Sequence, residues 1–308
     1  MQFTKIQLAL PAKPERHRRF GSVDPVSGNK PTTKEQMVDL QNQQKDFLFS
    51  IDRVGICRVR HPIQIRSEMA PTLQTSIATI SLTTSLEQNS KGINMSRLTE
   101  QLEQYRQEGW TTDLPELCHF ARELAERMNQ RKAEIRIDFP WFYERSAPVT
   151  EHTGLNHADA SIRVAHEIQK PPKITIGMSV AVTTLCPCSK EISEYSAHNQ
   201  RGTVAITAEI DPAALPVQDW KTALLAAAES NASSALHPIL KRPDEKRVTE
   251  QAYENPRFVE DMVRLVAADL YEMNAVLAFS VECRNEESIH LHDAVAAIYY
   301  DKRTEATH

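Results

Sequence analysis

The chain has 308 residues, of which 41% are apolar and 25% charged, an ordinary balance for a globular protein with a proper core. Its 36 Lys and Arg against 41 Asp and Glu give a net charge of −5, which argues against nucleic-acid binding through overall charge. Only 8 glycines are present, and the absence of a Gly-x-Gly-x-x-Gly or Walker-type loop excludes a Rossmann or P-loop nucleotide site.

No apolar run approaches the roughly 20 residues that a membrane-spanning helix needs, and the first residues lack the pattern of a secretory signal. The five cysteines are too few and too scattered for a disulfide scaffold, which indicates a reducing compartment. We therefore expect a cytoplasmic protein that associates with neither a membrane nor nucleic acid.

Residues 1–48 are polar and rich in Pro, Lys, Arg and Gln, which predicts an N-terminal arm that is partly disordered or packed on a partner subunit. Ordered structure is expected from about Phe49. Alternation of apolar and polar residues predicts strands within residues 77–82, 133–139, 162–168, 174–182, 204–210, 276–283 and 294–300. Helical spacing predicts helices at residues 96–108, 115–130, 217–229 and 256–273, the last with Asn255 as its N-cap.

These elements fall into two halves that follow the arm. Residues 49–150 give strands, two helices and a further strand, whereas residues 151–308 give strands, helices and two strands. This order predicts the α+β class with hairpin connections, and it suggests a duplicated unit although the two halves show no clear sequence similarity.

Residues 183–202 form the segment richest in reactive side chains. It follows a predicted strand, and Ser189 is placed to cap a short helix running to about Ala197. Cys186 and His198 then stand at the two ends of this helix, and their side chains meet only if the chain folds back after Ala197. Thiolate, imidazole and carboxylate donors suit zinc or a similar divalent ion with one open position. The alternative is a pair of strand-end cysteines beside a surface histidine.

A second candidate group lies in residues 286–293. His290 and His292 are two residues apart in a predicted strand, which directs both rings to the same side. Two such rings can bind a metal ion or phosphate, or transfer protons. The alternative is a polar edge strand with no chemical role.

Two further segments carry carboxylates. Residues 240–247 are densely charged, and Pro243 predicts a loop there, which offers a carboxylate ligand and phosphate-binding cations or is simply solvated. Glu260 lies on the last predicted helix, off its apolar stripe, and by itself this position predicts a solvent-facing side chain.

Together these segments resemble the prokaryotic type IB GTP cyclohydrolase I family. The most specific match joins residues 185–195 (Leu-Cys-Pro-Cys-Ser-Lys-Glu-Ile-Ser-Glu-Tyr) to residues 197–201 (Ala-His-Asn-Gln-Arg). Further matches lie at residues 51–56, 91–97, 241–246, 253–260 and 287–292. The resemblance runs from about residue 38 to residue 301.

The resemblance implies the tunnelling fold, with two tandem units of antiparallel sheet and helices in each subunit. Subunits of this fold join their sheets into a barrel around a central tunnel. The expected assembly is therefore a homo-oligomer, with a homotetramer favoured and active sites at the subunit interfaces.

The resemblance also implies a reaction, the conversion of GTP to 7,8-dihydroneopterin triphosphate and formate, which is the first step of folate biosynthesis. Cys186 and His198 match metal ligands, and Glu245 is expected as the third ligand in preference to Asp244. The expected cofactor is one divalent ion per site, either zinc, manganese or ferrous iron. Glu260 matches the carboxylate that anchors guanine, whose N1–H and exocyclic amine are two adjacent donors.

The remaining matched residues are assigned to proton transfer and to phosphate binding. The expected catalytic residues are Cys186, Cys188, Glu287, His290 and His292. The candidate cations for the triphosphate are Lys190, Arg201, Arg97 and Lys241, and the sequence does not rank them.

Two other functions stay open at this point. A nitrile reductase of the tunnelling fold that acts on a deazaguanine would use a nicotinamide cofactor and would need neither the Cys186–His198 pair nor the paired histidines. A non-catalytic pterin- or purine-binding protein of the same fold would not need the whole set of reactive residues. Zinc deaminases are excluded because their His-x-Glu and Pro-Cys-x-x-Cys patterns are absent.

Overall fold

The computed structural model describes residues 11–19, 22–24, 28, 31–37, 39, 41, 43–217 and 219–307. The chain divides into a unit of residues 1–40 and a unit of residues 41–308. The first unit contains the short helix α1 (Lys13–Arg19) and the 3₁₀ turn η1 (Lys34–Gln36), while much of the predicted N-terminal arm lies outside the described residues. In the second unit ordered pairing begins a little before Phe49, because the Lys45 N–H donates to the Asn89 carbonyl oxygen at 3.0 Å.

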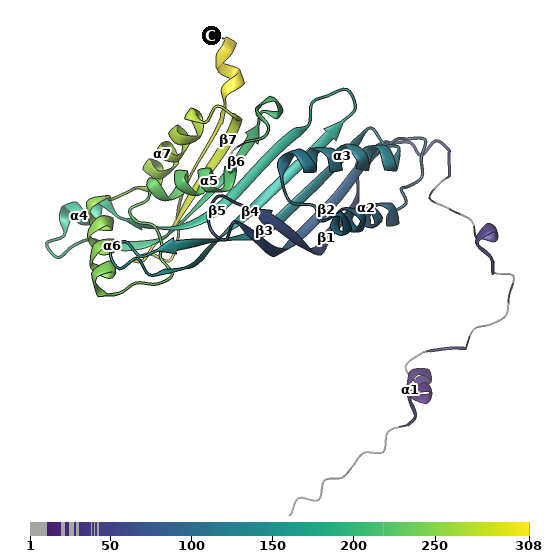
Figure 1. The fold of residues 1–308 in the computed structure, drawn as a ribbon, viewed down its shortest axis with the longest axis horizontal. Helices are drawn as coiled ribbons and strands as arrows, with labels where there is room; N and C mark the ends of the chain where they lie inside the picture. The colour runs from purple at the N-terminus through teal and green to yellow at the C-terminus, as the bar shows by residue number, and fades with distance from the viewer. Residues whose placement is uncertain are drawn as a thin grey trace, which may run out of the picture. The chain divides into compact units, whose positions relative to one another are not determined.

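Eight strands form one antiparallel sheet in which the spatial order follows the chain order (Figure 1). The strands are β1 (Ile51–Arg66), β2 (Leu73–Leu86), β3 (Lys132–Ser146), β4 (Thr153–Glu167), β5 (Lys173–Leu185), β6 (Asn199–Ile210), β7 (Val276–Glu286) and β8 (Ala294–Asp301). The helices are α2 (Ser96–Glu108), α3 (Leu114–Met128), α4 (Pro187–Ile192), α5 (Trp220–Ser230), α6 (Arg242–Glu254) and α7 (Val259–Glu272), with 3₁₀ turns η2 (Pro212–Ala214) and η3 (Lys302–Thr307).

The strand register separates the sheet into an apolar face and a polar face. One continuous row across the eight strands is apolar or aromatic: Val59, Ile80, Ile137, Ile162, Ile176, Ala208, Phe279 and Tyr300. The neighbouring row, displaced by one residue on each strand, is mostly small or polar: Arg60, Thr79, Asp138, Ser161, Gly177, Thr207, Ser280 and Tyr299. Because successive side chains of a strand point to opposite sides, the two rows belong to opposite faces.

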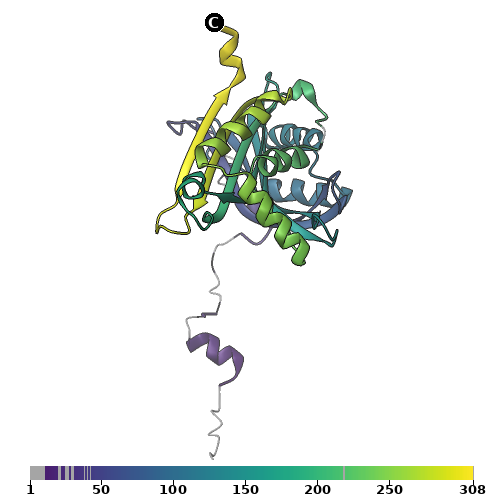
Figure 2. The ribbon, with the colours of Figure 1, turned by 90° about the vertical axis from the view of Figure 1, so that its left-hand side faces the viewer.

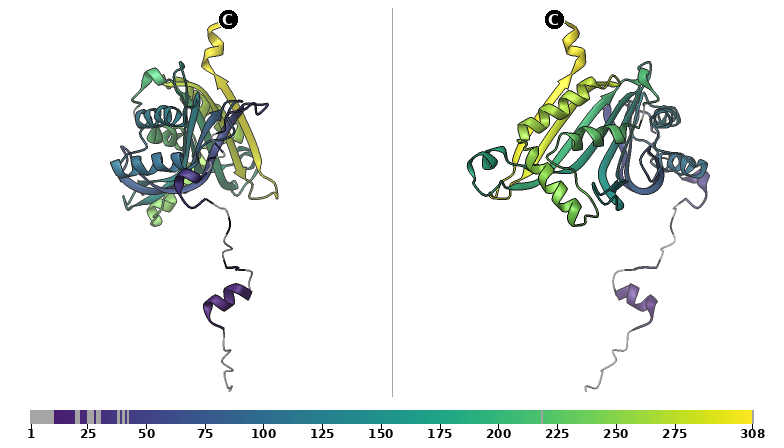
Figure 3. Two further views of the ribbon diagram at one scale, coloured as in Figure 1. Left: turned by 90° about the vertical axis from the view of Figure 1, so that its right-hand side faces the viewer. Right: turned by 60° about the vertical axis from the view of Figure 1, so that its left-hand side comes forward.

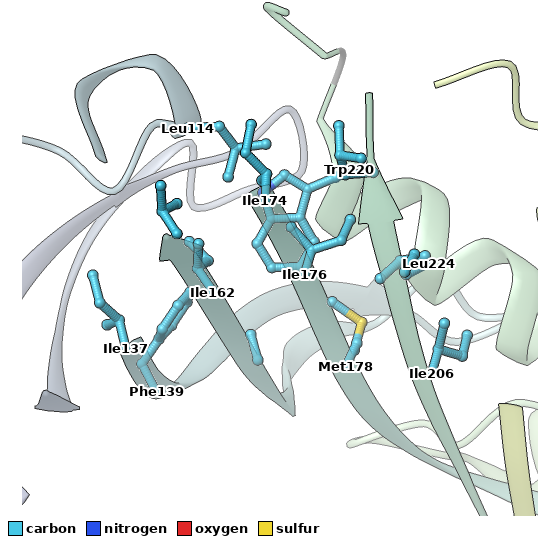
Figure 4. Close-up of a cluster of buried hydrophobic side chains, with 14 of the residues drawn as sticks. Leu114, Ile137, Phe139, Ile162, Ile174, Ile176, Met178, Ile206, Trp220 and Leu224 are labelled. Atoms are coloured by element: carbon cyan, nitrogen blue, oxygen red, sulfur yellow. The ribbon is translucent and has the colours of Figure 1, made fainter. Parts of the chain in front are cut away.

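The helices α3, α5 and α7 pack on the apolar face, and among the described residues of the second unit no helix covers the polar face (Figures 2 and 3). At the centre of the sheet Trp220 and Leu224 of α5 and Leu114 from the start of α3 belong to one buried cluster with the apolar residues of the sheet, and Trp220 lies next to Ile174 and Ile176 (Figure 4). Burial of these side chains, about 1.5–3 kcal/mol each, fixes which face of the sheet is inside.

The order of two strands, helices and two strands occurs twice along the chain, which confirms the predicted α+β class with tandem sheet-and-helix units. Since β4 and β5 are paired in one continuous sheet, the expected division into residues 49–150 and 151–308 stays an interpretation. No helix among the described residues is long and apolar enough to cross a membrane.

All seven predicted strands and the four longer predicted helices are present, but β1, α1 and α6 were not predicted. β1 lacks clear alternation because a bulge interrupts its register between Ile56 and Val59, with Arg58 at a φ of 58°. The start of the last predicted helix was also wrong: α7 begins at Val259 with Phe258 as its N-cap, and Asn255 instead caps the C-terminus of α6.

Candidate active site

The candidate site begins where β5 ends and α4 starts. Leu185, the last residue of β5, pairs with Asn199, the first residue of β6. One residue further, the backbone N–H of Cys186 donates a hydrogen bond to the carbonyl oxygen of His198 at 3.1 Å. The chain therefore does fold back between these two residues, and the end of the sheet fixes them opposite one another.

The helix between them differs from the predicted one. Cys186, and not Ser189, is the N-cap of α4, and the helix ends at Ile192 instead of about Ala197. Pro187 suits the first helical position because the N–H that it lacks needs no partner there. The Cys186 Sγ atom accepts the backbone N–H of Ser189 at 3.5 Å, which is the capping contact.

The Ser189 hydroxyl joins both members of the pair. Its Oγ donates to the Cys186 carbonyl oxygen at 3.1 Å, and the same atom accepts a hydrogen bond from the backbone N–H of His198 at 3.2 Å. Cys186 and His198 are half-buried, whereas Cys188 is exposed on α4. Sequence reasoning gave Ser189 only a capping role, because the contact with His198 exists only after the chain folds back.

The loop between β7 and β8 reaches the same place. The Oγ of Ser288 lies 3.1 Å from Nδ1 of His198, and Glu287 is half-buried beside it in the chain. The exposed rings of His290 and His292 are stacked, with centroids 4.8 Å apart and planes 12° apart. The predicted common orientation of the two rings is confirmed, but the predicted strand is wrong because both residues lie in the loop.

The charged segment of residues 240–247 is also not the predicted loop. Pro243 is the second residue of α6, where a proline is tolerated because the first turn of a helix has no internal use for its N–H. Glu245 lies in the first turn of the same helix and is exposed.

Asp244, next to Glu245, is completely buried and has a structural role. One carboxylate oxygen accepts the backbone N–H groups of Val149 and Thr150 at 2.9 and 2.8 Å. The other accepts the Thr150 hydroxyl and the backbone N–H of Lys241. Burial raises the pKa of Asp244, but these hydrogen bonds outweigh burial and hold the pKa below its usual range. Both oxygens of Asp244 are thus occupied, which supports the preference for Glu245 as a ligand.

Within a single chain, Glu245 is not placed to bind a metal ion together with Cys186 and His198. At the other end of α6, the Lys190 ammonium donates to the Tyr253 carbonyl oxygen at 2.6 Å and lies 4.3 Å from the centre of the Tyr253 ring. Glu245 precedes Tyr253 by a helical distance of about 12 Å. Among the described residues of a single chain, no group of three or more His, Cys, Asp and Glu side chains is arranged to hold a metal ion.

Glu260 is exposed in the first turn of α7. The connection between α6 and α7 lies against the end of β5, because the backbone N–H of Arg257 donates to the Leu185 carbonyl oxygen at 3.0 Å. The structure therefore places the start of α7 beside the strand end that precedes Cys186. Arg257 was not singled out from the sequence, since nothing in its neighbours indicates this long-range contact.

The candidate cations are distributed over the sheet. Lys190 belongs to α4, and Arg201 is exposed on β6 opposite Glu286 of β7, so both lie near the Cys186–His198 pair. Arg97 is exposed in the first turn of α2, which lies against β1 in the other half of the sheet. Within one chain, Arg97 does not join the other candidates.

The other cysteines have no comparable surroundings. Burial raises the pKa of Cys283 to about 12 and that of Cys118 to about 11, which makes both thiols unreactive near neutral pH. Cys57 is exposed on β1, away from the β5–β6 end of the sheet.

One large hollow of the described chain lies away from the candidate site. It has a volume of about 770 Å³ and lies on the helix-free face at the centre of the sheet, lined by small and hydroxyl-bearing residues such as Ser161, Gly177 and Thr207. None of the candidate residues lines this hollow, so the chemistry is not assigned to it.

The family model described as "Type I GTP cyclohydrolase folE2" matches residues 37–296 of the chain. A protein of Exiguobacterium named GTP cyclohydrolase FolE2 is 60% identical over 300 residues, covering 97% of this chain and 98% of the relative. Proteins of the same name from Bacillus licheniformis and Bacillus subtilis are 60% and 57% identical, each covering 96% of this chain.

Among solved structures, uricase from Arthrobacter globiformis superposes with a TM-score of 0.52 at 9% identity, covering 83% of this chain and 95% of the uricase. This likeness concerns the fold alone, and it agrees with the expected tunnelling fold. The similarity to the FolE2 proteins is much stronger, because 57–60% of the aligned residues are identical, compared with 9% for the uricase. The chain therefore belongs to the type I GTP cyclohydrolase FolE2 family of enzymes.

Proposed function

We propose that the chain, as a type IB member of its family, converts GTP to 7,8-dihydroneopterin triphosphate and formate at a site built around Cys186 and His198. The observation that carries the assignment of the site is the direct backbone hydrogen bond between these two residues, with the β7–β8 loop attached to His198 through Ser288. The expected cytoplasmic location stays a prediction.

A divalent ion suits the donor types of this site, because a backbone hydrogen bond joins the residues that carry the thiol and the imidazole, and the side chain of Glu245 is exposed. Cys186, His198 and Glu245 would hold the ion, and zinc, manganese and ferrous iron all remain candidates. When bound, such an ion supplies an activated water molecule for attack on the purine ring.

The other residues of the site have proposed roles in binding and proton transfer. Glu260 accepts the N1–H and the exocyclic amine of guanine, which fixes the base. When the bond between C8 and a ring nitrogen breaks, His290 or His292 donates a proton to that nitrogen. Loss of formate, sugar rearrangement and ring closure need further proton transfers, for which Cys188 and Glu287 are the nearest candidates. Net consumption is one water for each formate released.

The site is proposed to be completed by a second copy of the chain. The third ligand, Glu245, and the cation Arg97 both lie away from the Cys186–His198 pair of their own chain. Exposed apolar side chains also lie on the segments that contact this pair, which are the end of α4, the loop after it and the β7–β8 loop: Ile192, Tyr195, Ile289 and Leu291 are 83%, 91%, 63% and fully exposed. A homo-oligomer, with a tetramer favoured, would bury these side chains and bring the missing groups to the pair.

The decisive experiment is turnover by the purified protein after removal of metal with a chelator. GTP is added with zinc, manganese or ferrous iron in turn, and formate and the fluorescence of the oxidised pterin are measured. We expect both products together and only with metal. Metal binding without either product would contradict the proposal and favour a binding protein, whereas nicotinamide-dependent reduction of a deazaguanine nitrile would identify the reductase.

A further inference from the structure

We propose that Ser288 is a positioning residue that fixes the ring of His198 with Nε2 free to bind the metal ion. This inference rests on the proposed metal site and adds a residue to it. Its basis is a contact between segments 90 residues apart, the 3.1 Å approach of Ser288 Oγ to Nδ1 of His198.

The backbone polar groups of His198 are held by Ser189 of α4 and by Cys186 at the end of β5. Its backbone N–H donates to Ser189 Oγ at 3.2 Å, and its carbonyl oxygen accepts the N–H of Cys186 at 3.1 Å. With Nδ1 engaged by Ser288, the remaining polar atom is Nε2, for which the described part of the chain offers no hydrogen-bond partner. The backbone is therefore fixed by two contacts, and the ring by Ser288.

The direction of the Ser288 hydrogen bond determines what His198 can do. A neutral imidazole carries its proton on one nitrogen only, and the other nitrogen keeps the lone pair that binds a metal ion. When Nδ1 carries the proton and donates it to Ser288 Oγ, the lone pair is on Nε2, with which no other described residue forms a hydrogen bond. Partners of this kind orient ligating histidines, and their loss costs roughly 10- to 100-fold in metal affinity.

Ser288 also joins two groups of functional residues. It is preceded by Glu287 and followed by His290 and His292 in the β7–β8 loop, so the hydrogen bond ties the proton-transfer candidates to a metal ligand. Loss of the Ser288 hydroxyl is then expected to affect metal affinity first and the position of this loop second.

The test compares wild type with S288A, S288T and S85A, using Co²⁺ as the probe. Ser85, at the end of β2, is a matched control because its Oγ also accepts one hydrogen bond, from the Lys132 N–H at 3.2 Å. Co²⁺ affinity is measured by competition with a chromophoric chelator, and the thiolate-to-cobalt absorption band reports Cys186. We expect S288A to weaken binding roughly 10- to 100-fold, with S288T and S85A close to wild type and the melting temperatures of the metal-free proteins equal.

Equal Co²⁺ affinity in S288A and wild type would overturn the role of Ser288. A second measurement needs no variant: long-range ¹H–¹⁵N spectra of the metal-free protein labelled at histidine should show the proton of His198 on Nδ1. A proton on Nε2 would overturn the proposal as well. Wild type that binds Co²⁺ without the thiolate band would refute the metal site itself, whereas normal Co²⁺ binding without GTP turnover would refute only the proposed reaction.

Discussion

The backbone N–H of Cys186 donates to the carbonyl oxygen of His198 at 3.1 Å, and this bond closes the segment that carries α4. The bond continues the pairing of β5 with β6 by one residue, so the geometry of the pair depends on the sheet and not on the short helix. A side-chain substitution at either residue should therefore remove a metal-ligating atom without unfolding the chain.

Cys186→Ala is expected to abolish both metal binding and GTP turnover while the assembly stays folded. The backbone bond to His198 survives the substitution, and only the Sγ atom is lost. Metal content by elemental analysis, formate release and circular dichroism give the three readouts. Cys57→Ala, which removes an exposed thiol on β1, is the control and should behave as wild type. An active Cys186→Ala protein without metal would refute the assignment.

Substitutions of the two adjacent acidic residues at the start of α6 should have different effects, one on metal affinity and the other on thermal stability. Glu245→Gln is expected to lower metal affinity roughly 10-fold or more with little change in stability, because the side chain is exposed. Asp244→Asn is expected to lower the melting temperature by several degrees, because an amide NH₂ would face the donors of Thr150 and Lys241. Metal titration and thermal unfolding of the metal-free proteins separate the two effects. A metal defect in Asp244→Asn without a stability defect would reverse the assignment.

Asp244 should also make stability depend on acid pH. Its folded pKa lies below the unfolded value of about 3.9, so its contribution is complete above that value and is lost as pH falls through it toward the folded pKa. In Asp244→Asn this contribution is absent at every pH. The free energy of unfolding, measured with urea at neutral pH and at about pH 3, should therefore differ less between the two pH values in the variant than in wild type. An unchanged difference would exclude the carboxylate of Asp244 as a source of acid sensitivity.

Glu260→Gln should raise the KM for GTP roughly tenfold or more, because a carboxylate that accepts two donors of guanine is worth about 1.5–3 kcal/mol per charged hydrogen bond. Stability should change by less than about 1 kcal/mol, the usual effect of one charge in the first turn of a helix. Asp261→Asn removes the same charge from the next residue, whose carboxylate caps the Phe258 N–H at 3.4 Å, and should leave KM unchanged. Steady-state kinetics decide, and equal KM values in all three proteins would remove Glu260 from the site.

Mixing two variants that each lack a different metal ligand tests whether a second copy completes the site. Cys186→Ala and Glu245→Gln are refolded together from denaturant, and turnover is compared with that of each variant refolded alone. If the two residues act from different chains, random assembly restores about a quarter of the sites. No recovery from properly assembled oligomers would show that both ligands come from one chain.

Much of the fold could be predicted from the sequence because periodicity and burial agree. The strands around Ile137, Ile162 and Ile176 alternate cleanly, and these residues form one apolar row in the sheet. The errors occur where a local signal has two meanings. Pro243 was interpreted as a helix breaker but occupies the second position of α6, and the bulge in β1 hides its alternation.

The residues of the candidate site also fall into two groups: some could be found from local sequence patterns, and others only from contacts between distant segments. Residue types and spacing identified Cys186, His198 and the His290–His292 pair, whereas the choice of Glu245 and the roles assigned to all of these residues came from the resemblance to a family. Ser288 and Arg257 could not be found in this way, because their partners are far away in the chain. Nor could the sequence separate Asp244 from Glu245 physically, since the difference is that one carboxylate is enclosed by the β3–β4 turn and the other is not.

The sequence by itself determined the α+β class, most of the strands and helices, the reactive side chains and the family. Only the tertiary structure decided that Cys186 and His198 are neighbours, that Ser288 holds the ring of His198, and that Glu245 stays apart from them within one chain. The physical reason is range: propensity and periodicity act over a few residues, whereas the site is formed by sheet register and by hydrogen bonds between segments up to 90 residues apart.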